Sequence, residues 1–121
     1  MFQLGTKAFT SYGEHLSKAL RGLPEAHRRA SAQAAAHVHQ SVVGAASEAG
    51  WEPEGAIGTV WHEGQHWISI AKDKNGSRVF NKEFGTHKAP PNPVIRTTIS
   101  SKMAEANTIY GWHLNSELGL F

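Results

Sequence analysis

The chain has 121 residues, of which 40% are hydrophobic and 18% are charged, a balance typical of globular proteins and unlike that of disordered ones. Twelve Lys and Arg against ten Asp and Glu give a formal charge of +2, which is too small to indicate nucleic-acid binding by itself. The absence of cysteine excludes disulfides and thiolate metal sites, and it suits synthesis in a reducing compartment.

The length fits one domain, so we expect a single core over residues 1–121. The first residues lack a long apolar run after a basic start, and no stretch approaches the ~18 apolar residues of a membrane span. We therefore expect neither a signal peptide nor a membrane helix.

Residues 6–49 are predicted to be helical. Apolar residues recur three or four positions apart over 6–22, as on one face of an amphipathic helix, and Gly22 is expected to end that helix. Pro24 can occupy the first turn of a second helix over 26–49, where its missing N–H costs nothing. One face of this second helix carries small side chains, which favours core packing and leaves a subunit interface as the alternative. That face consists of Ala30, Ala34, Val38, Val42, Ala45 and Ala49.

Residues 56–88 are predicted to form antiparallel strands. Val, Ile, Trp and Thr alternate with polar residues over 59–62 and 66–70, around a short turn at 63–65. A third strand is expected over 77–80, because Asn75-Gly76 is typical of a type I′ hairpin turn.

The last part of the chain is predicted to be an extended connection followed by a helix. Three prolines stiffen residues 89–96, and residues 97–117 place Ile99, Met103, Ala106 and Tyr110 on one helical face. The predicted fold class is α+β, with one or more N-terminal helices, antiparallel β-hairpins forming a small sheet, and a C-terminal helix packed on that sheet.

The segment from His62 to His66 matches the HExxH pattern of zinc hydrolases, in which two histidines on one helical face bind Zn²⁺ and Glu63 polarises the bound water. Here the flanking residues favour strands and Gly64 interrupts the motif, so we expect no metal site. Phosphate-binding loops, nucleophile elbows and cysteine are also absent, and we expect no catalytic residue and no cofactor. A zinc-dependent hydrolase using His62, Glu63 and His66 is the alternative from another class.

Basic residues gather in the middle of the chain, interleaved with Phe80 and Phe84. On alternate positions they could form a basic sheet face that binds nucleic acid, although Asp73 and Glu83 dilute it. A solvated strand surface is the simpler interpretation. The basic residues are Lys72, Lys74, Arg78, Lys82 and Lys88.

Residues 83–86 read Glu-Phe-Gly-Thr, and a proline-rich turn then leads to Pro-Val-Ile-Arg at 93–96. The segment over about 78–105 resembles the HK97 gp10-like family of tailed-phage tail-completion proteins. That family shows Glu, an aromatic residue, Gly and Thr, then a proline-rich turn and a Pro-Phe/Val-Leu/Ile-Arg start to its closing helix. Val94 stands where the family often has Phe.

The resemblance implies a structural protein of the phage neck, made in the host bacterial cytoplasm and located in the virion. It implies a homo-oligomeric ring, expected to be a hexamer, between the tail tube protein and the head connector or stopper, with genomic DNA passing through the lumen without sequence readout. Another neck or minor tail component is the alternative of the same class. By the same analogy, partner contacts are expected at Lys72, Lys74, Arg78, Lys82, Glu83, Phe84, Lys88 and Arg96.

Overall fold

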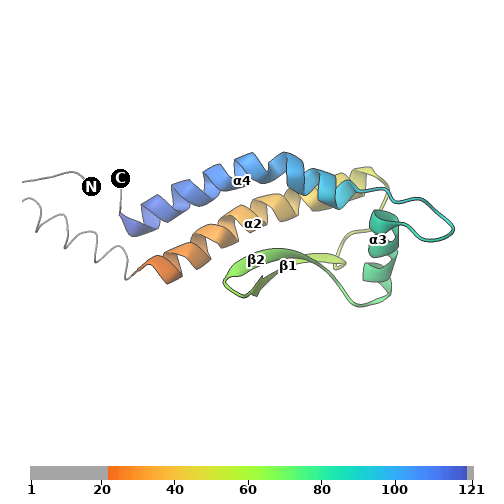
Figure 1. Ribbon diagram of the computed structural model, residues 1–121, viewed down its shortest axis with the longest axis horizontal. Helices are drawn as coiled ribbons and strands as arrows, with labels where there is room; N and C mark the ends of the chain where they lie inside the picture. The colour runs from red at the N-terminus through yellow and green to blue at the C-terminus, as the bar shows by residue number, and fades with distance from the viewer. Residues whose placement is uncertain (1–21, 120–121) are drawn as a thin grey trace, which may run out of the picture.

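The computed structural model describes residues 22–119, in which helices and one β-hairpin alternate along the chain (Figure 1). The helix predicted over 6–22 lies outside the described residues, apart from Gly22 at the N-cap of the first described helix. None of the described helices is long and apolar enough to cross a membrane. In chain order the elements are α2 (Leu23–Glu48), β1 (Ile57–His62), β2 (Gln65–Ile70), α3 (Lys74–Phe84) and α4 (Val94–Leu118).

The two long helices, α2 and α4, lie side by side and run in opposite directions (Figure 1). Pro24 stands in the first turn of α2, as predicted. The buried face of this helix is made mostly of small side chains, which allow close approach. This face therefore packs in the core. Of the predicted face, Ala45 is only half-buried and Ala49 is exposed, because the buried stripe ends at Ala46.

Strands β1 and β2 form the predicted hairpin, joined by a two-residue turn, with Gln65 already in β2. Glu63 and Gly64 both have positive φ, 52° and 75°, as a type I′ turn requires. Trp61 lies opposite His66 on the face toward α2, whereas Val60 lies opposite Trp67 on the outer face. The outer pair is about half exposed, at 46% and 49%.

The prediction of a third strand and a second hairpin over 74–88 is wrong, because residues 74–84 form helix α3. The side chain of Asp73 accepts a hydrogen bond from the Gly76 N–H at 2.8 Å, which is an N-cap contact. Gly76 packs so closely on the Ala71 carbonyl that a Cβ would collide with it. Val79 and Glu83, four residues apart, are both buried, as the period of a helix requires.

Helix α4 begins at Val94, three residues before the predicted start, and Ile95 in its first turn is buried. On its predicted face, Ala106 is buried, but Met103 is 45% exposed.

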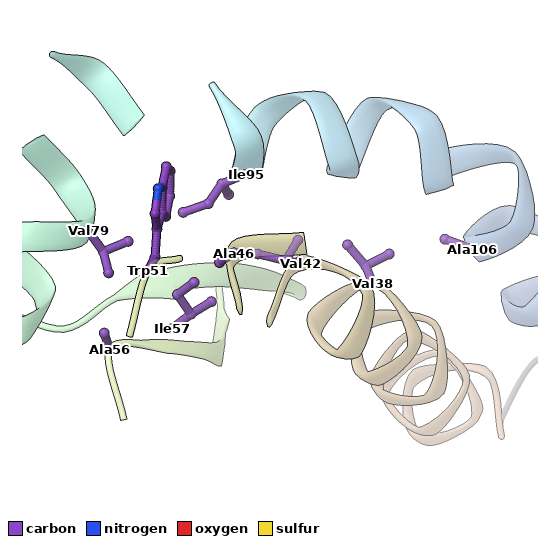
Figure 2. Close-up of a cluster of buried hydrophobic side chains, with 9 residues drawn as sticks. All are labelled: Val38, Val42, Ala46, Trp51, Ala56, Ile57, Val79, Ile95 and Ala106. Atoms are coloured by element: carbon purple, nitrogen blue, oxygen red, sulfur yellow. The ribbon is translucent and has the colours of Figure 1, made fainter. Parts of the chain in front are cut away.

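The buried core lies where α2, the hairpin, α3 and α4 meet (Figure 2). It is built around Trp51, in the connection after α2, and includes residues from every described element except β2, whose Ile68 and Ile70 pack against it. The α+β class is confirmed, with α4 along one side of α2 and the hairpin along another. The core residues are Val38, Val42, Ala46, Trp51, Ala56, Ile57, Val79, Ile95 and Ala106.

Candidate functional site

A buried carboxylate joins the end of α3 to the start of α4. Glu83 has no exposed surface, and its two oxygens accept the main-chain N–H groups of Ile95 at 2.7 Å and Arg96 at 3.0 Å. The Arg96 Nε donates to the same carboxylate at 2.9 Å, and a terminal guanidinium nitrogen donates to the Glu83 carbonyl at 2.9 Å. The first N–H groups of a helix have no partner within the helix, so an anion there satisfies them and stabilises the positive end of the helix dipole. We call the contacts between Glu83, Ile95 and Arg96 the clasp.

The connection between α3 and α4 folds back tightly over the clasp. Gly85 has φ 79° and ψ 171°, a conformation that side chains rarely adopt, and a Cβ there would lie 2.7 Å from the Pro91 nitrogen. The Asn92 N–H donates to the Lys82 carbonyl at 2.9 Å. Gly85 and the prolines therefore hold the two helices at one angle.

The clasp changes the interpretation of two predicted partner contacts. Glu83 was expected to contact a partner, but it is buried and fully engaged within the chain, so that expectation is wrong. Arg96 is partly exposed, yet its guanidinium is held by Glu83 and lies over the Phe84 ring, 4.4 Å from the centroid. Both residues act inside the fold.

The predicted basic residues do gather, but on a helix instead of a sheet. Lys74, Arg78 and Lys82 follow one another at four-residue spacing along α3 and are exposed. Within residues 22–119, no carboxylate lies within 4.0 Å of these three cations or of Lys72 and Lys88, which flank the helix. We call these five residues the cationic surface.

Clefts border the cationic surface on its side facing Trp51. Arg78 and Lys82 line both a cavity of about 170 Å³ beside Gly50 and Glu52 and an open groove of about 560 Å³ beside Asn92. Long cationic side chains beside hollows of this size can contact acidic groups that project from a partner.

The other side of α3 is apolar. Phe80 and Phe84 are stacked, with centroids 4.7 Å apart, and remain 50% and 44% exposed. Phe80 also borders a groove of about 680 Å³ that runs beside Ile68 and Ile70 of β2. Helix α3 therefore separates a groove lined by Arg78 and Lys82 from one lined by Phe80, Ile68 and Ile70. The sequence did not predict this division because residues 77–80 were interpreted as a strand.

The HExxH match lies on the hairpin, where its two histidines point to opposite faces. His66 lies opposite Trp61, so it shares a face with Trp61, while the next residue along β1, His62, points the other way. The two imidazoles cannot meet one Zn²⁺, and within residues 22–119 no group of three potential ligands clusters.

His66 instead belongs to a cluster that joins the hairpin to both long helices. His27 of α2 donates from Nε2 to the Gly64 carbonyl at 2.8 Å, so in the neutral ring its Nδ1 accepts from the Tyr110 hydroxyl of α4 at 2.7 Å. Ser31 donates to the Arg28 carbonyl, so the His66 Nδ1–H donates to the Ser31 oxygen at 2.8 Å.

Burial lowers the pKa of His66, and the nearby positive charges of Arg28 and His27 lower it further. Trp61 lies between these groups, 4.7 Å from the His66 ring and 5.1 Å from the Arg28 guanidinium carbon. We call His27, Ser31, Trp61, His66 and Tyr110 the histidine cluster. The sequence did not predict it, because its members are far apart along the chain.

Comparison of the chain with family models, with curated proteins and with solved structures found no match.

Proposed function

We propose that this chain is a structural protein of a tailed-phage neck, a tail-completion or head–tail joining protein that works by assembly. The observation that carries the proposal is the clasp. The Glu-Phe-Gly-Thr stretch and the Pro-Val-Ile-Arg helix start, which carry the resemblance to the HK97 gp10-like family, meet in space and form one unit through Glu83 and Arg96. Gly85, in the same stretch, is required by the fold-back over the clasp.

This unit suits a protein that transmits force between partners. Buried charge-assisted hydrogen bonds depend strongly on geometry, so they hold α3 at one angle to α4. The exposed surface of α3 is thereby presented on a rigid base. No step of this role requires a catalytic group, and the hydrolase alternative loses its geometry because His62 and His66 point apart.

The cationic surface is the proposed partner contact. Within residues 22–119 no carboxylate lies within 4.0 Å of these five cations, so a partner that supplies carboxylates or phosphates would place them most favourably. In the proposed assembly, copies of the chain form a hexameric ring that contacts the tail tube protein on one side and the head connector on the other, with DNA passing through the lumen.

The test is complementation of particles assembled without this protein. Purified chain is added to separated heads and tails, and joined particles are counted by electron microscopy and by infectivity. We expect wild-type chain to restore joining and the double variant Arg78→Glu, Lys82→Glu to lose it by about tenfold or more, because reversed charges repel an acidic partner.

The matched control is Arg29→Glu, Lys102→Glu, which makes the same change of charge on α2 and α4, away from α3. It should join particles nearly as well as wild type, since the pairs that it breaks are all exposed and such pairs contribute little. These pairs are Arg29–Glu25, Arg29–Glu117 and Lys102–Glu105. Full joining in the absence of the chain would refute the neck assignment, and equal losses in both double variants would refute the assignment of the contact to α3.

A further inference from the structure

The β-hairpin has two edges, and they differ in how their main-chain groups are used. The Ala71 N–H donates to the Ala56 carbonyl at 2.8 Å, so Ala56 and Ala71 stand at a hydrogen-bonded position, and in an antiparallel ladder such positions alternate with non-bonded ones. By this alternation, the main-chain N–H and C=O groups of β1 that point away from β2 belong to Ile57, Thr59 and Trp61. Those of β2 belong to His66, Ile68 and Ile70.

The edge of β1 is partly closed. The Ile57 N–H donates to the Pro53 carbonyl at 3.2 Å, and the Ile57 carbonyl accepts from His39 Nε2 at 2.9 Å. These contacts also confirm that Ile57 points its main chain outward. A partner strand along β1 would have to displace both hydrogen bonds.

The edge of β2 is open. Within residues 22–119, no hydrogen bond involves the outward main-chain groups of His66, Ile68 or Ile70. The groove of about 680 Å³ bordered by Phe80 leaves space beside Ile68 and Ile70. Unpaired strand edges beside apolar surface are the usual sites at which a further strand is added to a sheet.

We propose that β2 pairs with β2 of a second copy, antiparallel, about a two-fold axis at Ile68. This register places Ile68 opposite Ile68 of the partner subunit and His66 opposite Ile70 of the partner subunit, so all three outward residues of each strand are used. Three hydrogen-bonded pairs, each exchanging two bonds, give about six main-chain hydrogen bonds. Because, among the described residues, only the β2 edge of the hairpin is fully open, pairing of like edges satisfies both copies at once and gives a closed dimer of the free protein.

The charges near the strand ends and the positions of the helices also favour a second copy of the chain as the partner of β2. In this register Glu63 of the partner subunit approaches Asp73, which is flanked by Lys72 and Lys74, and within residues 22–119 no carboxylate lies within 4.0 Å of either lysine nitrogen. The Glu63 side chain is 79% exposed, and among the described residues its carboxylate lies near one basic group, His62 Nε2 at 3.5 Å. The two-fold axis stands perpendicular to the sheet, so both α2 helices cover the same face of a four-stranded sheet, a two-layer arrangement.

The dimer concerns the free protein and does not depend on the neck assignment, because it can exist whether or not the chain joins phage particles. It is tested by native mass spectrometry and light scattering over a concentration series, together with amide exchange followed by NMR. We expect a dimer in which the Ile68 amide is protected from exchange while the Thr59 amide, outward on the opposite edge, exchanges fast.

Two proline variants complete the experiment, of which Ile68→Pro also removes a side chain that packs against the core. Ile68→Pro and Thr59→Pro each remove one outward N–H that makes no bond across the hairpin, so the ladder tolerates both. We expect Ile68→Pro to raise the dimer Kd by about tenfold or more and Thr59→Pro to leave it unchanged. Circular dichroism shows whether each variant is folded, and if Ile68→Pro does not fold, the amide exchange of the wild-type protein decides. A monomer at every concentration, or an oligomer in which Ile68 and Thr59 amides exchange equally fast, overturns the proposal.

Discussion

The two ends of the α2–α4 pair are held by different chemistry. At the α3 end, the clasp uses a fully buried carboxylate whose partners lie 12 and 13 residues away along the chain. At the opposite end, the histidine cluster uses partly exposed imidazoles and hydroxyls whose partners lie 35, 37 and 83 residues away. The first arrangement is local and charged, and the second is long-range and titratable.

This difference indicates which parts of the molecule are rigid. Removing a partner from a buried charged network leaves other buried groups without hydrogen bonds, which costs far more than losing a contact that water can replace. The clasp should therefore fix the angle of α3, while the hairpin turn can separate from the helices at a lower cost. A variant that breaks the clasp should therefore lose more stability than a variant that breaks the histidine cluster.

The largest effect is expected from Glu83→Ala. This change leaves the first N–H groups of α4 and the Arg96 guanidinium without their acceptor, and it opens a cavity where a full side chain was buried. We expect a loss of about 3 kcal/mol or more in the free energy of unfolding, measured by urea denaturation. Glu25→Ala, at an exposed site with a single 4.0 Å ion pair, is the control and should change stability by less than about 0.5 kcal/mol. Similar losses in the two variants would contradict the role given to the clasp.

The next effect is expected from Gly85→Ala, which strains the fold-back over the clasp. Gly85 has a positive φ, and the added Cβ would meet the Pro91 backbone and ring, neither of which can move freely. We expect a loss of about 2–3 kcal/mol, measured by the same denaturation. Gly44→Ala makes the identical chemical change inside α2, where no atom lies within 4 Å of the added Cβ. It should stabilise the chain by about 0.5–1 kcal/mol, so variants of equal effect would contradict the strain at Gly85.

The same contrast explains what the sequence could predict. The β1–β2 hairpin was predicted to within two residues at its strand ends, although with a three-residue turn at 63–65 instead of two residues, because alternation and turn residues are local signals. Helix α3 was missed because Asn75-Gly76 was interpreted as a hairpin turn. The competing signal was Asp73, which lies three residues before Gly76 and caps the helix.

Burial and distant contacts were harder to predict. Glu83 and Arg96 were predicted to be partner contacts, because a sequence shows that a residue is charged and not that it is buried. The cations at Lys74, Arg78 and Lys82 were assigned to a sheet face, and their actual stripe on α3 requires the helical period. The histidine cluster depends on the packing of α2 against both the hairpin and α4, for which no local pattern exists.

The smallest effect is expected from the pH dependence of the histidine cluster. The pKa of His66 is lowered in the folded state below its usual value of 6.5, so folding favours the neutral ring. The stability that this group contributes is complete above about pH 6.5 and is lost as the pH falls from there through the folded pKa. We expect the free energy of unfolding to decrease on acidification over this range, and amide exchange to rise first in the hairpin turn while α3 stays protected. His66→Gln should flatten this decrease, whereas His87→Gln, at an exposed loop position, should leave it unchanged. A pH profile that is the same in wild type and His66→Gln would show that the hairpin end is held by contacts that do not titrate.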